Sequence, residues 1–165
     1  MFHAKSVAEW VKAGDEATPA WCYFNNDESV GVIHGKLYNW HAVTDSRGLA
    51  PNGWEIPSDS DWNKFIASIG NVNNAGLRLK ANQGWMADGN GNNLSGFEAL
   101  PSGGRYNDGT FSSFGVSSFF WTSTDHLMFY GKYVELRHND KAVSINNIDK
   151  GYGFSVRVFR KLEIQ

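Results

Sequence analysis

The chain has 165 residues, with a formal net charge of -2 and 19% charged residues. This length suits one domain with its own core, and the near-neutral charge gives no reason to expect a basic surface for nucleic acid or an anionic membrane. The single cysteine excludes an intrachain disulfide and a cysteine-based zinc site, and no apolar run reaches the roughly 18 residues that cross a bilayer. We expect one domain over residues 1–165, with no cofactor, no nucleic-acid partner and no membrane insertion.

The composition is rich in aromatic and turn-forming residues, with 7 Trp, 11 Phe, 6 Tyr, 18 Gly and 16 Asn. A helical bundle would favour Leu, Ala, Glu and Lys, and a disordered chain would be poor in aromatic residues. The composition therefore predicts a loop-rich domain in which large rings fill the space between turns.

The first helix signal lies near the N-terminus. Ser6 and Glu9 have the spacing of a capping box, and Gly14 supplies a stop. Short aromatic or β-branched runs at 21–24 and 36–43 then predict strands. Between these runs, residues 25–28 and Gly31 are typical of turns.

A stronger helix signal follows Pro57. Ser58 is the expected N-cap, with Asp61 three residues later, and Gly70 ends the pattern. Apolar residues recur at helical spacing at Trp62, Phe65, Ile66 and Ile69. This pattern predicts a helix at about 59–69.

The second half of the chain changes character twice. Residues 70–115 are dominated by Gly, Asn, Ser and Asp with regularly placed apolar anchors, which indicates an ordered, packed loop. The remainder is typical of an antiparallel meander, with a hairpin turn at 138–141. The expected strands are 119–121, 132–137, 142–146 and 153–160. The order of elements predicts the α+β class.

Residue types used in catalysis are present without a catalytic pattern. Cys22 lies in an apolar aromatic run, so we interpret it as a small buried side chain with a raised pKa. Carboxylates and amides between 125 and 149 are of the type that calcium prefers, but they are also ordinary turn residues, and no EF-hand pattern is present. Metal-ligand spacing is absent among the five histidines His3, His34, His41, His126 and His138.

The segment from Thr122 to Tyr152 mixes Tyr, His, Asn, Arg and Met at turns and on alternating strand positions. These residue types are typical of a binding surface, because rigid amphipathic rings supply contact area at low entropic cost. The alternative is that half of them pack inward, as strand alternation requires.

Seven sequence blocks appear in order along about residues 18–160. They are Pro19–Tyr23, Gly35–Val43, Arg47–Trp54, Ile56–Asp59 with Trp62, Ser95–Pro101, Phe119–Thr124 and Tyr152–Arg157. Together they resemble the Fibrobacter succinogenes major paralogous domain family. The resemblance implies a C-type-lectin-like fold of the version shared with formylglycine-generating enzymes, with two helices around a small twisted antiparallel sheet and long ordered loops.

The resemblance also implies a role at a surface. Members of the family occur in secreted or lipid-anchored bacterial proteins, and some are variable proteins of diversity-generating retroelements in bacteria and phages. In such proteins a fixed scaffold displays a randomised C-terminal stretch, which here would match about residues 119–150. The implied location is extracellular, on the cell surface or on a phage particle, with any export signal absent from this chain.

We therefore expect a non-enzymatic ligand-binding module for a protein or glycan ligand, with homo-oligomerisation left open. The expected contact residues are Asp125, His126, Met128, Phe129, Tyr130, Arg137, His138, Asn139, Asn146 and Asn147. The expected core residues are Trp40, Trp54, Trp62, Phe97, Trp121 and Phe154.

Two other classes stay open. One is a structural module of a cell surface or virion, which would use this face only for assembly. The other is an oxidase-like enzyme of the formylglycine-generating superfamily. That chemistry uses a cysteine pair, and this chain has only Cys22.

Overall fold

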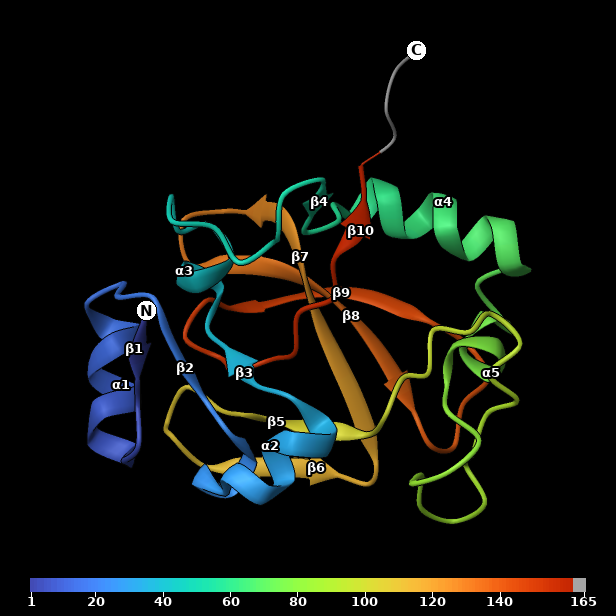
Figure 1. Ribbon diagram of the computed structural model, residues 1–165, viewed down its shortest axis with the longest axis horizontal. Helices are drawn as coiled ribbons and strands as arrows, with labels where there is room; N and C mark the ends of the chain where they lie inside the picture. The colour runs from blue at the N-terminus through green and yellow to red at the C-terminus, as the bar shows by residue number, and fades with distance from the viewer. Residues whose placement is uncertain (162–165) are drawn as a thin grey trace.

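The computed structural model describes residues 1–161, in which helices and strands are mixed along the chain (Figure 1). Its helices are α1 (Val7–Asp15), the short 3₁₀ helix η1 (Phe24–Asn26), α2 (Glu28–His34), α3 (Trp40–Val43), α4 (Asp59–Ile69) and α5 (Ala75–Leu79). Its strands are β1 (Phe2–His3), β2 (Ala20–Cys22), β3 (Leu37–Tyr38), β4 (Trp54–Glu55), β5 (Ser102–Arg105), β6 (Phe111–Phe114), β7 (Ser117–His126), β8 (Tyr130–Arg137), β9 (Ser144–Asp149) and β10 (Phe159–Arg160). This content agrees with the predicted α+β class.

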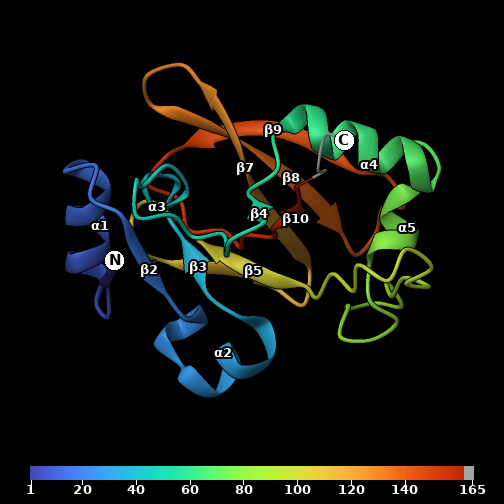
Figure 2. The same ribbon diagram turned by 45° about the horizontal axis from the view of Figure 1, so that its top comes forward.

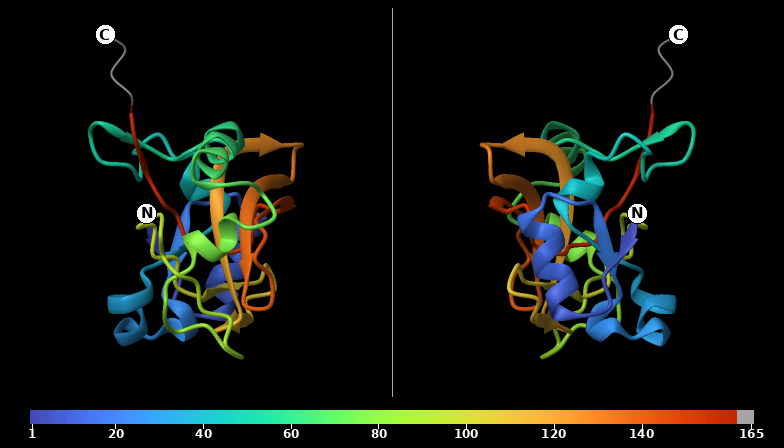
Figure 3. Two further views of the ribbon diagram at one scale, coloured as in Figure 1. Left: turned by 90° about the vertical axis from the view of Figure 1, so that its right-hand side faces the viewer. Right: turned by 90° about the vertical axis from the view of Figure 1, so that its left-hand side faces the viewer.

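The strands within residues 1–161 form three sheets. The largest has the order β6-β5-β7-β8-β9, and all its pairs are antiparallel except β5 with β7. The second sheet has the order β1-β2-β3, and β10 pairs with β4 in the third. The long hairpin of β7 and β8 runs through the centre of the molecule, and its tip projects from the body (Figures 2 and 3).

Side chains of the large sheet pack in two layers because successive strand residues point to opposite faces. On one face, Phe120, Val134 and Leu136 pack against α4 and α5. On the other face, Phe119, Trp121 and Tyr133 pack with Phe154, Trp40 and Val43. A third cluster lies between α1 and the small sheet, around Trp10, Ala20 and Cys22. The large sheet therefore has one face covered by α4 and α5. The part of its other face beyond Tyr133 is open.

The predicted capping box of Ser6 and Glu9 and the predicted N-cap at Ser58 are confirmed. Ser6 accepts the Glu9 N–H at 3.2 Å, and Ser58 accepts the Asp61 N–H at 3.2 Å. The helix predicted at about 59–69 is α4, and the first predicted helix is α1. None of the helices within residues 1–161 has the length and apolar character needed to span a membrane.

The expectation of only two helices is wrong. Residues 25–31 look like turn formers, yet Asp27 caps α2 by accepting the Ser29 N–H at 2.8 Å. No residue of α2 is buried, so the helix carries no apolar periodicity that a sequence could reveal. The five-residue α5 lies in the segment expected to be loop.

Two predicted strands are largely wrong. The run 36–43 forms only the two-residue β3 and then turns into α3, because buried Asn39 caps that helix through the Ala42 N–H at 3.1 Å. The run 153–160 forms isolated bridges to three different partners before β10. The predicted strands 119–121, 132–137 and 142–146 are present as β7, β8 and β9 with shifted ends.

The predicted core is confirmed for four tryptophan or phenylalanine residues and corrected for one. Trp40, Trp62, Trp121 and Phe154 are at most 5% exposed, and Phe97 is partly buried against the cluster of α4. Trp54 is 42% exposed, because it lies in the short edge strand β4 that pairs only with β10.

Candidate functional site

The tip of the β7–β8 hairpin gathers five of the ten expected contact residues. Leu127, Met128 and Phe129 are 71%, 78% and 65% exposed, and Tyr130 is 43% exposed. Asp125 is also exposed and His126 is half-buried. These neighbours form an apolar projection, whose residues 125–130 we call the hairpin tip.

A buried lysine fixes the shape of the hairpin tip. The Lys150 ammonium donates to the carbonyl oxygens of Leu127 at 3.3 Å and Met128 at 3.1 Å. It also lies 2.7 Å from the Asp125 carboxylate and 4.4 Å from the centre of the Trp40 ring. Because charge-assisted hydrogen bonds are strong where water is excluded, the exposed side chains stand on an ordered backbone.

Replacing this lysine should loosen the tip. We expect Lys150→Met to lower the free energy of unfolding by about 1.5–3 kcal/mol, the range for a hydrogen bond to a charged group. Amide hydrogen exchange should accelerate most at residues 127–130. The exposed Lys141 provides a matched control, and equal exchange at the tip in Lys150→Met and Lys141→Met would contradict the anchoring role.

The other five expected contact residues lie elsewhere. Arg137, His138 and Asn139 are at the far end of the 8-residue strand β8, and its rise of about 3.3 Å per residue separates them from the tip by roughly 23 Å. Asn146 and Asn147 lie on the edge strand β9 and pair with Tyr133 and Lys132, and as neighbours in a strand they point to opposite faces. The ten expected residues therefore do not form one site.

Arg137, His138 and Asn139 line a pocket of about 500 Å³ on the open face of the large sheet. We call it the tyrosine pocket. Its lining residues are Tyr106, Ser113, Val116, Ser117, Phe119, Tyr133, Glu135, Arg137, His138, Asn139, Ile148, Tyr152 and Phe154.

Strand alternation builds the floor of this pocket. Tyr133, Glu135 and Arg137 occupy alternate positions of β8 and share one face, and Phe119 lies opposite Glu135 on β7. Tyr106 and Tyr152 form a wall with ring centres 5.3 Å apart, and the Tyr133 ring lies 5.0 Å from that of Phe154. The pocket thus offers aromatic faces together with phenolic hydroxyl groups.

An ion pair forms the charged part of the tyrosine pocket. Arg137 Nε donates to Glu135 Oε1 at 2.6 Å, and Arg137 Nη2 donates to Glu135 Oε2 at 3.1 Å. The Glu135 side chain is 6% exposed and that of Arg137 is 60% exposed. The pairing raises the pKa of Arg137, so the guanidinium stays charged and presents its remaining N–H groups to solvent.

Burial changes the pKa of two tyrosines that line the pocket. Burial raises the pKa of Tyr133, with the nearby Glu135 carboxylate adding to the effect, and burial likewise raises the pKa of Tyr152. Both phenols are therefore neutral near pH 7 and act as hydrogen-bond donors and acceptors.

A second buried lysine holds the turn beside this pocket. Lys80 is 2% exposed, and its ammonium donates to the carbonyl oxygens of Arg137 at 3.0 Å and Asp140 at 2.9 Å. Burial lowers the pKa of Lys80. This contact between the long loop region and the β8–β9 turn positions His138 and Asn139 at the rim.

Sequence reasoning missed several pocket residues. Glu135 and Tyr133 could have been found by extending the period of two backward from Arg137 along β8. Tyr106 follows β5 in a turn of the irregular middle region, where its N–H donates to the Thr110 carbonyl at 2.7 Å, and no local pattern marks it.

Two of the candidate calcium ligands hold turns in the described part of the chain. No group of three or more His, Cys, Asp or Glu side chains in residues 1–161 could hold a metal ion. Two of the calcium-type carboxylates serve turns, with Asp140 accepting the Ala142 N–H at 2.8 Å and Asp149 accepting the Gly151 N–H at 2.7 Å.

The thiol of Cys22 lies in the buried cluster beside α1. It is 0% exposed, and burial raises its pKa from 9.0 to about 11.

We expect thiol reagents to modify Cys22 in the native protein at pH 8 only as fast as the protein unfolds. The pKa of the Cys22 thiol is higher in the native protein than in the unfolded chain. The stability that this thiol contributes is therefore complete below pH 9 and is lost as the pH rises through about 11. Denaturant unfolding from pH 8 to 11 should show a steeper loss for the wild type than for Cys22→Ala, and parallel curves would contradict this.

The family model described as the Fibrobacter succinogenes major domain matches residues 3–160. The chain belongs to this family. Comparisons with curated proteins and with solved structures gave no match. The Fibrobacter succinogenes major domain of this chain therefore includes the hairpin tip, both anchoring lysines and every residue of the tyrosine pocket.

Proposed function

We propose that this protein is a non-enzymatic ligand-binding module and that the tyrosine pocket is its binding site. The observation that carries the proposal is the pocket itself, in which three tyrosines surround a Glu135–Arg137 pair on an otherwise open sheet face. Ligand sites are concave and largely aromatic, with a few polar groups that fix orientation. The aromatic faces suit a sugar ring or a flat side chain, so the ligand is a glycan or a protein.

The non-enzymatic part of the proposal rests on how the reactive groups are used. Glu135 accepts hydrogen bonds from two nitrogens of the Arg137 guanidinium, so both of its carboxylate oxygens are engaged. Cys22 lies in the cluster under α1, and it is not among the residues that line the pocket. A bound ligand would meet hydrogen-bonding groups but no activated nucleophile.

Glycan and protein arrays probed with the purified domain test the proposal. For any ligand found, we expect Arg137→Lys to weaken binding about tenfold, because lysine keeps the charge but loses the fork that pairs with Glu135. Arg78→Lys on exposed surface is the matched control. Tyr133→Phe, which removes only a hydroxyl, should weaken binding by a smaller factor. Unchanged affinity in Arg137→Lys would place the binding site elsewhere.

We further propose that the fold is C-type-lectin-like and that the module is displayed outside the cell or on a phage particle. The capped helix α1 against the small sheet, the capped helix α4 against the large sheet and the ordered loop region from Lys80 to Pro101 support this fold. More than half of the pocket-lining residues come from the stretch 119–150 that a diversity-generating retroelement would alter. A neighbouring reverse-transcriptase gene with a near-repeat of this stretch would support display, and its absence would count against it.

A second candidate function is assembly through the hairpin tip. Four consecutive apolar side chains at a projecting tip favour contact with another molecule, which includes a second copy of this chain. Light scattering of the wild type and of Phe129→Ser separates the candidates. A change in mass with unchanged ligand binding would support the assembly role.

A further inference from the structure

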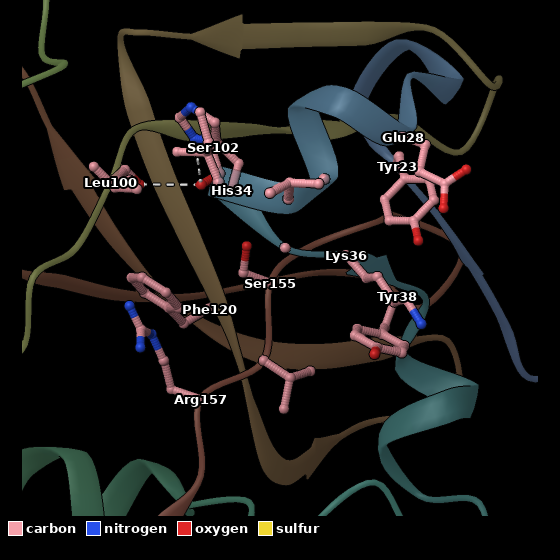
Figure 4. A pocket seen from close by; sticks show the side chains of 15 residues that line it. Tyr23, Glu28, His34, Lys36, Tyr38, Leu100, Ser102, Phe120, Ser155 and Arg157 are labelled. Atoms are coloured by element: carbon pink, nitrogen blue, oxygen red, sulfur yellow. Dashed lines mark hydrogen bonds between the residues drawn. The ribbon is translucent and has the colours of Figure 1, made fainter.

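A second pocket, of about 550 Å³, lies beside α2 and shares no lining residue with the tyrosine pocket. We call it the α2 pocket. One wall is α2 with the following Gly35 and Lys36, and the other wall is the extended segment Ser155–Arg157 (Figure 4). Phe120, from the face of β7 opposite to Phe119, forms part of its floor.

This pocket occupies the place of an interrupted strand pair. Tyr38 and Phe154 exchange both backbone hydrogen bonds, at 2.8 Å and 3.0 Å, as an antiparallel pair does. In a continued ladder the next such pair would be Lys36 with Val156. That pair does not form, and Gly35, with φ of +77°, ends α2 immediately before Lys36.

Val156 is consequently left with an open backbone edge. The backbone of its neighbour Ser155 pairs with β7. The Ser155 N–H donates to the Phe119 carbonyl at 3.1 Å, and the Ser155 carbonyl accepts the backbone N–H of Trp121 at 3.0 Å. By the alternation of an extended chain, the Val156 N–H and C=O point to the opposite side, toward Lys36 and the pocket. No backbone or side-chain hydrogen bond joins these two groups to any residue in 1–161.

The side chains around this backbone edge determine which ligand charge the α2 pocket favours. Figure 4 shows Arg157 and Lys36 on opposite sides of Ser155. The Arg157 guanidinium stacks 5.1 Å from the Phe97 ring centre, and the Lys36 ammonium lies 3.9 Å from that of Trp21. Glu28 is the carboxylate among the lining residues, so the pocket has an excess of positive charge.

From this arrangement we propose that the α2 pocket binds an extended peptide segment of a partner protein, which pairs with Val156 as an added strand and places an acidic side chain near Arg157. A free carboxylate or phosphate would satisfy the cations alone. A peptide backbone also supplies the donor and acceptor that match both groups of Val156.

The test uses a display library of random short peptides selected on the immobilised wild-type protein. We expect enriched sequences to carry an acidic residue among β-branched ones. Binding of an enriched peptide should slow amide hydrogen exchange at Val156, since that N–H becomes a donor. Failure to enrich any sequence above the bare support, or unchanged exchange at Val156 with peptide bound, would overturn the proposal.

Variants distinguish backbone pairing from general adhesion. Val156→Pro removes the N–H, and we expect it to weaken peptide binding about tenfold, whereas Val156→Ala keeps the donor and most of the affinity. Arg157→Glu should abolish enrichment of acidic peptides without touching the backbone edge. Equal binding by Val156→Pro and Val156→Ala would overturn the strand pairing. Arg137→Lys should leave peptide binding intact, so failure of the tyrosine pocket as a site would not affect this result.

Discussion

We expect Trp62→Ala to lower the free energy of unfolding by about 3–5 kcal/mol, the range for removing a fully buried aromatic side chain. Trp62 is 0% exposed and joins α4 to the large sheet. Its ring centre lies 5.2 Å from that of Phe159, 5.4 Å from Phe97 and 5.8 Å from Phe120. The alanine variant would leave a cavity in contact with three separate segments of the chain, and denaturant unfolding measures the loss.

Trp62→Phe is the control for this substitution. The indole N–H of Trp62 is buried and has no hydrogen-bond partner among residues 1–161, so phenylalanine removes no hydrogen bond. We expect a clearly smaller loss of stability than for alanine, because most of the ring contacts remain. A melting temperature of Trp62→Ala equal to that of the wild type would contradict the core assignment.

The second large effect concerns a buried arginine. Arg105 is 0% exposed, and its guanidinium donates to the carbonyl oxygens of Ala4 at 3.2 Å, Ser6 at 2.9 Å and Gly109 at 3.1 Å. It also lies between two rings, 4.9 Å from the centre of Trp10 and 4.6 Å from that of Phe111. This one side chain therefore fastens the N-terminal segment to the turn after β5.

We expect Arg105→Met to destabilise the protein by about 3 kcal/mol or more. A hydrogen bond to a charged group contributes about 1.5–3 kcal/mol, and three carbonyl groups lose their donor. Hydrogen exchange should accelerate in β1 and α1 before the large sheet is affected. The exposed Arg78 provides the control, and a comparable loss in Arg78→Met would show that the effect does not depend on burial.

The predictions that held were those in which local pattern and tertiary packing agree. In α4 the cap at Ser58, the apolar period and the stop at Gly70 all specify one helix, and Trp62 and Ile66 are buried as the period requires. The predictions failed where one contact overrides the pattern. Asn39 is such a case, because its buried amide accepts the N–H groups of Ala20 and Ala42 and thereby turns a β-like run into α3.

The candidate site was only partly predictable for a similar reason. Strand alternation can place Arg137 with Tyr133, but it cannot show that Tyr106 and Tyr152 come from distant turns to complete the pocket. The hairpin tip was predictable as a surface, since Met128 and Phe129 stand where a turn must expose them. The distance between the hairpin tip and Arg137 depends on the length of β8, which begins two residues before the predicted strand.

The two buried lysines affect which substitutions the loops at the ends of β8 can tolerate. Lys150 and Lys80 bind the loops at the two ends of β8 through main-chain carbonyl oxygens. Every residue type provides that acceptor, so these contacts do not depend on which side chains the loops carry. Substitutions at positions such as 127 and 128 can therefore alter the exposed chemistry while the loop backbones keep their anchors, and the mutational tolerance of both loops depends on two lysines outside them.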